Sequence, residues 1–215
     1  RPADDGALLS ELLSRVGRDA LEPLGGHLAG APPRLLRHLL AVFDQLDAWP
    51  SQADPSYYAT HPDVVVRREA LKFLLKRDAT RASATLTAVR DREVSILGLG
   101  IGHVDSTCPV DVATVLMSRY AEPELTPDVR VELIRVVASS GTGEAQAWLG
   151  ALLLSRRWIL GPRLRPPTPE CIAAAAALVG HFRASPLAQQ VVALAQRGPA
   201  VEYRRAVYRT ARGAA

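Results

Sequence analysis

The chain has 215 residues, of which 48% are hydrophobic, 22% charged and only 5% aromatic, with a formal net charge of +4. Abundant alanine and leucine with few aromatic residues favour a globular protein built from helices packed on helices rather than from a sheet. Two cysteines, Cys108 and Cys171, are too few for a disulfide framework and lack metal-ligand spacing. The longest uncharged apolar run, 171–180, is about half the ~20 residues that span a bilayer, so no membrane span is predicted.

The chain begins at Arg1 rather than at a methionine, and no signal peptide is visible. We therefore expect an excised domain or processed fragment of a larger chain. The expected location is the cytoplasm.

Helical periodicity begins near the N-terminus, but it is irregular over the first 60 residues. A short amphipathic helix is predicted at 8–16, and a second begins at Pro32-Pro33 and ends before Pro50. The segment 49–60 is predicted to be irregular. Residues 1–60 are therefore interpreted as a divergent repeat or an N-terminal cap.

Residues 61–76 contain the clearest helix, because Val66, Ala70 and Leu74 recur every four residues and share one face. Later helices are predicted from residues 80, 91, 107, 126, 142, 168, 185 and 198, for roughly ten in all. Three of them open with Ser or Thr followed by Pro, which suits a helix start because the first side chain caps an N–H and Pro needs no partner. Related starts at 61, 91, 126, 168 and 198 are 30, 35, 42 and 30 residues apart. These periods are typical of two-helix solenoid repeats.

The segment beginning at His61 and reading His-Pro-Asp-Val-Val-Val-Arg-Arg-Glu-Ala-Leu resembles the second helix of a HEAT repeat, and residues 127–130 resemble the same start. Val94 departs from the pattern, because Ser95 follows it where the pattern expects Arg. A resemblance to bacterial HEAT-repeat, armadillo-like proteins implies an all-α fold, an α-solenoid of antiparallel helix pairs in a right-handed superhelix. It would run continuously through 1–60 and 61–215, and such proteins mostly act as scaffolds or partner-binding surfaces.

Charge is segregated along the chain: residues 1–154 carry a net −4 and residues 155–215 a net +8. The longest predicted loop, an insertion at 155–167, holds the candidate partner-binding residues Arg156, Arg157, Trp158, Arg163 and Arg165. Arginine beside tryptophan suits contacts with phosphate, carboxylate or a protein partner. The alternative is that Trp158 packs into the core while the arginines are solvated.

No catalytic constellation, phosphate loop or metal-ligand spacing is visible, so no catalytic residue, cofactor or metal is predicted. The preferred hypothesis is a non-enzymatic scaffold that binds another protein or another domain of its parent chain. The first alternative is nucleic-acid binding through the basic C-terminal third. The second is an enzyme resembling the HEAT-like alkylpurine DNA glycosylases. Those enzymes use aromatic and Asp residues that lie close together on one face. The pair that comes nearest in this sequence is Trp49 and Asp54, with Pro50 between them.

Overall fold

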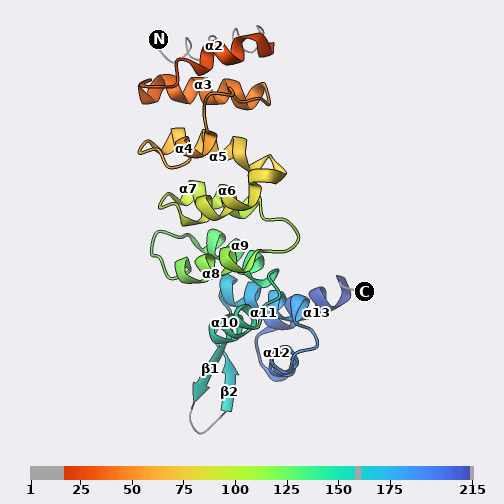
Figure 1. Cartoon of the computed structure of the whole chain (residues 1–215). Coiled ribbons are helices and arrows are strands. Elements are labelled where there is room, and N and C mark those ends of the chain that lie inside the picture. The colour runs from red at the N-terminus through yellow and green to blue at the C-terminus, as the bar shows by residue number, and fades with distance from the viewer. Residues whose placement is uncertain (1–16, 158–160, 214–215) are drawn as a thin grey trace. The chain divides into compact units, whose positions relative to one another are not determined.

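The computed structural model describes residues 17–157 and 161–213. Within these ranges the chain forms twelve α-helices, one short 3-10 helix and a single two-stranded hairpin (Figure 1). The mostly helical, all-α composition predicted from the sequence is confirmed. The chain divides into two compact units, residues 1–103 and residues 104–215. The predicted boundary at residues 60 and 61 lies inside the first of them.

The first unit contains helices that pack mainly on their neighbours in the chain (Figure 1). Its elements are η1 (Gly17–Ala20), α2 (Leu21–Gly25), α3 (Pro33–Gln45), α4 (Pro55–Tyr58), α5 (Val64–Leu75), α6 (Asp78–Arg90) and α7 (Val94–Gly102). Helix α5 packs against α3, α4, α6 and α7. The predicted stripe of Val66, Ala70 and Leu74 is buried, which makes α5 the centre of this unit.

An aromatic cluster holds the segment that was predicted to be irregular. The ring of Trp49 lies 5.4 Å from Phe43, 6.0 Å from Tyr58 and 4.8 Å from Phe73, measured between ring centroids. The same segment forms the short helix α4, because the Asp54 side chain accepts a hydrogen bond from the Ser56 N–H and Pro55 follows the cap. The cluster therefore fixes residues 49–58 against α3 and α5.

The glycines at 98, 100 and 102 lie within the continuous helix α7. A Cβ at Gly100 would lie 2.8 Å from the Cβ of Ala88 and 3.2 Å from the backbone nitrogen of Val89. Glycine at this position therefore permits the close approach of α6 and α7.

Two arginine–aspartate pairs recur along the first unit. Arg37 on α3 forms a two-pronged contact with Asp63, the N-cap residue of α5, whose carboxylate also accepts from two backbone N–H groups. Arg67 on α5 contacts Asp91, just before α7, at 2.6 and 3.0 Å. Each pair joins one helix to the start of the next but one. The pairs thereby set the spacing of α3, α5 and α7.

The second unit is built around α11, which packs against α9, α10, α12 and α13. Its elements are α8 (Val110–Arg119), α9 (Pro127–Ala138), α10 (Gly143–Leu153), β1 (Leu154–Arg157), β2 (Gly161–Leu164), α11 (Pro169–His181), α12 (Pro186–Arg197) and α13 (Val201–Gly213). The buried residues of α11 include Ala174, Ala175 and Ala177, whose small side chains admit its neighbours closely.

The predicted helix starts at Thr126, Thr168 and Ser185 are confirmed. Each side chain accepts a hydrogen bond from the backbone N–H three residues later, at 3.4, 3.2 and 3.1 Å respectively. In each case proline occupies the first helical position. These caps satisfy donors that the helix itself leaves unpaired.

Apolar residues of several helices form the core, among them Val66, Ala70, Phe73, Leu97 and Leu133. Val129, Trp148 and Ile172 are only partly buried. Trp148 packs edge-on against Tyr120, with 5.3 Å between ring centroids, and this contact covers only part of its ring.

Replacing Leu133 by alanine tests the core of the second unit. Leu133 is fully buried on α9, so Leu133→Ala should lower the free energy of unfolding by ~2–5 kcal/mol through loss of apolar burial and creation of a cavity. The exposed Arg205 on α13 provides the control, and Arg205→Ala should cost ~0.5 kcal/mol or less. Urea denaturation of both variants measures the difference. Equal losses would mean that α9 does not bury this face.

The pairing of Arg37 with Asp63 predicts an acid-dependent loss of stability. The Arg37 guanidinium, with help from two backbone N–H groups, lowers the pKa of Asp63 from 3.8 to about 2. Because the folded-state pKa is the lower one, the stabilisation is fully present above the unfolded-state pKa and is lost as the pH falls towards 2. Thermal melting of the wild type and Asp63→Asn between pH 2 and pH 7 should show a difference in stability that shrinks below about pH 4. A difference that is constant with pH would contradict the pairing.

Candidate functional site

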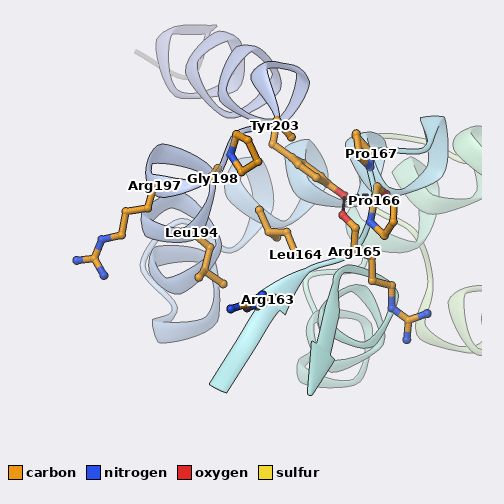
Figure 2. A pocket seen from close by; sticks show the side chains of 12 residues that line it. Arg163, Leu164, Arg165, Pro166, Pro167, Leu194, Arg197, Gly198 and Tyr203 are labelled. Carbon is orange, nitrogen blue, oxygen red and sulfur yellow. Dashed lines mark hydrogen bonds between the residues drawn. The ribbon is translucent and has the colours of Figure 1, made fainter. Parts of the chain in front are cut away.

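A pocket of about 480 Å³ lies in the second unit, between strand β2 and the turn that joins α12 to α13 (Figure 2). One wall is formed by β2 and by the segment of residues 165–167 that follows it, and the opposite wall by the end of α12 and the start of α13. Most lining residues are apolar: Leu164, Pro166, Pro167, Leu194, Ala195, Pro199 and Ala200. All of the lining residues belong to one compact unit.

The first wall comes from the predicted insertion at 155–167, and its structure corrects the prediction of a loop. Strands β1 and β2 pair antiparallel, with Leu154 opposite Leu164 and Arg157 opposite Gly161. The Arg165 N–H then donates to the Leu153 carbonyl at 2.8 Å, so the ladder continues into the end of α10. Gly161 opens β2 with a φ of +73°, a conformation that glycine adopts without strain. The insertion is thus a β-hairpin, and Figure 1 shows it extending beyond the helices of its unit.

A hydrogen bond from Tyr203 on α13 connects the second wall of the pocket to the first. Its side chain is only 1% exposed, and its hydroxyl donates to the backbone carbonyl of Arg165 at 3.0 Å (Figure 2). The Pro166 carbonyl lies at 3.4 Å from the same hydroxyl. Burial, together with the nearby Cys171 thiol, raises the pKa of Tyr203 above its usual range, so the phenol remains protonated and able to donate. This bond spans 38 residues of sequence and fixes the depth of the pocket.

Three exposed arginines border the pocket: Arg163 on β2, Arg165 just after it, and Arg197 at the end of α12. In Figure 2 the side chains of Arg165 and Arg197 extend on opposite sides of the pocket, with Arg163 between them. No acidic residue is among the lining residues that the structure describes. The rim is therefore cationic and the interior apolar.

The structure brings together part of the predicted site. Arg163 and Arg165 line the pocket as candidates for partner contact. Arg156 and Arg157 lie on β1, but their side chains fall outside the described part of the chain, as does Trp158 entirely. Whether Trp158 enters the core therefore stays a prediction.

Sequence reasoning missed Arg197 and Tyr203 as parts of this site. The only signal for Arg197 was its place in the last turn of a helix, where a cation is favoured for reasons unrelated to binding. No motif or spacing in the sequence marks Tyr203 as part of a site. Their role depends on a contact between segments that are almost forty residues apart, and helical periodicity does not report such contacts.

Other groups that could carry chemistry have structural roles. Cys108 is 1% exposed, and burial raises its pKa to about 11, which suppresses the reactive thiolate. The Cys171 Sγ lies 3.6 Å from the carbonyl of Leu152. Trp49 packs in the aromatic cluster and Asp54 caps α4.

Metal and membrane sites were also sought in the described residues. Within 17–157 and 161–213, no group of three or more His, Cys, Asp or Glu side chains is placed to hold a metal ion. None of the helices described has both the length and the apolar character needed to cross a bilayer.

Comparison with known proteins finds no family model, curated protein or solved structure that matches this chain. The resemblance to HEAT repeats therefore depends on the motifs at 61–71 and 127–130.

Removing the Tyr203 hydroxyl tests the link between the pocket walls. Tyr203→Phe should lower the free energy of unfolding by about 1 kcal/mol, because the Arg165 carbonyl loses its hydrogen-bond donor. Tyr208 lies on the same helix but is 55% exposed, and Tyr208→Phe is the matched control with an expected change near zero. Chemical denaturation measures both values. Indistinguishable losses would show that the hydroxyl does not hold the two walls together.

Proposed function

We propose that the chain is a non-enzymatic HEAT-like helical-repeat module that binds another protein or another domain of its parent chain. Two features support the repeat interpretation. One is the recurring Pro-Asp helix start, and the other is the pair of arginine–aspartate contacts, which link α3 to α5 and α5 to α7 in the same way. Repeated helices with equivalent contacts suit a continuous solenoid, in which each repeat stabilises the next.

The pocket beside β2 is the observation that carries the binding proposal. An apolar interior with charged groups at its edge is the usual character of a site that anchors a side chain of a partner. The three arginines at its rim fit a partner that is negatively charged around the anchor. Free cysteines, one of them buried, fit a reducing compartment such as the cytoplasm.

Nucleic-acid binding is the second candidate, because residues 155–215 carry a net +8. The placement of the arginines favours the protein partner. Arg163, Arg165 and Arg197 surround an apolar hollow, whereas a phosphate backbone needs a cationic track and gains nothing from the hollow. Among the described lining residues Tyr203 is the only aromatic one, and it is buried and offers no free ring face for a stacked base.

Quantitative affinity capture from cells that naturally express the protein tests the proposal. The whole chain is the bait, and Arg163→Glu/Arg197→Glu is compared with Arg183→Glu, an exposed arginine of the same unit that does not line this pocket. A partner lost with the first variant and retained with the second is then purified and titrated against the chain. We expect saturable binding with a modest dependence on salt.

A parallel titration with duplex DNA and single-stranded RNA tests the alternative. Tight binding to either, falling steeply with salt and reduced by the Arg163→Glu/Arg197→Glu pair, would overturn the protein-binding proposal.

A further inference from the structure

The interior of the pocket is suited to one large apolar side chain. Its volume is about 480 Å³, whereas a dry cavity of about 150 Å³ already accommodates a benzene ring. The walls contributed by Leu164, Pro166, Leu194 and Pro199 have no polar side-chain atoms. The hydroxyl of Tyr203, which is among the described lining residues, already donates to a backbone carbonyl. An aromatic ring or a branched aliphatic group would therefore displace water from this interior without leaving a polar side chain unpaired.

The arginines at the rim of the pocket favour negatively charged groups on either side of an inserted apolar side chain. Arg197 lies on one side of the pocket and Arg165 on the other, with Arg163 between them (Figure 2). The ion pairs found among the described residues do not include these three arginines. Their guanidinium groups are exposed and available for carboxylates on both sides of an inserted group.

The shape of the wall favours an extended ligand. Strand β2 ends at the pocket and continues into Pro166 and Pro167, so an extended segment can follow this wall. In an extended chain, side chains alternate between faces at about 3.3 Å per residue, so residues two positions apart point the same way about 7 Å apart. Acidic residues two positions before and after the anchor would then face the arginines.

From these observations we infer that the pocket binds an extended acidic segment in which one large apolar residue has a carboxylate residue two positions before it and another two positions after it. The inference rests on the proposed function, because it names the partner chemistry of the same site. The apolar residue supplies the anchor, and the two carboxylates fix the register of the segment against Arg165 and Arg197.

Fluorescence anisotropy with synthetic peptides tests the inference on the whole chain. The probe is a labelled nonapeptide with a central phenylalanine, glutamates two residues before and after it, and glycine and serine elsewhere. We expect a dissociation constant in the micromolar range or weaker, as for a single short segment. Replacing the phenylalanine by alanine should weaken binding by about tenfold or more. Replacing both glutamates by glutamine should weaken it by about three- to tenfold, and by lysine still more.

Variants of the protein provide the matched test. Arg165→Ala/Arg197→Ala should weaken binding of the glutamate peptide by about tenfold but leave the glutamine peptide unchanged, because only the former needs the cations. Leu194→Ala should weaken both peptides by enlarging the cavity. Arg205→Ala, an exposed arginine on α13 that does not line the pocket, should change neither. Circular dichroism and thermal melting check that each variant is folded.

The outcomes separate this inference from the proposed function. Equal affinity for the phenylalanine and alanine peptides, or for the glutamate and lysine peptides, overturns the inference. So does binding that the arginine pair does not affect. If these peptides fail while the captured partner still depends on Arg163 and Arg197, the segment pattern is wrong and the protein-binding module stands. If the peptides behave as expected but no partner protein depends on the pocket, the proposed function fails instead.

Discussion

Every α-helix described in this protein has thirteen residues or fewer and must bury one apolar face against its neighbours. Helices of this length are marginal in water by themselves, so their stability comes from packing. Consecutive packing follows from this constraint: α5 lies among α3, α4, α6 and α7, and α11 lies among α9, α10, α12 and α13. The central helices α5 and α11 each bury several residues completely, and Gly100 allows α6 and α7 to approach closely.

Ion pairs and caps then set how the packed helices are spaced. Asp63 is both the N-cap of α5 and the partner of Arg37, so a single carboxylate fixes the start of one helix and the position of another. Asp91 combines a similar pair of roles, since it accepts from Arg67 and from the backbone N–H of Glu93. Such double use explains how one acidic residue at a turn can organise the packing of two helices.

The candidate site arises where this regular packing is interrupted. The hairpin of β1 and β2 separates α10 from α11, and its continuation, residues 165–167, is held by Tyr203 from the last helix. Residues 165–167 and the α12–α13 turn leave a hollow between them, and Pro166, Pro167 and Pro199 form part of its walls. No acidic side chain is among the lining residues that the structure describes, and this is the physical basis for proposing an acidic partner.

The sequence by itself determined the helical class and many helix starts, because these depend on local chemistry. The four-residue recurrence of Val66, Ala70 and Leu74 and the caps at Thr126, Thr168 and Ser185 needed no knowledge of distant residues. It also singled out Arg163 and Arg165, because they lie in the insertion at 155–167 that interrupts the spacing of the predicted helices. The tertiary structure alone decided that the insertion pairs as a hairpin and that Arg197 and Tyr203 join it. Strand pairing and the Tyr203 hydrogen bond connect segments far apart in sequence, and neither composition nor periodicity encodes such contacts in a form that can be read locally.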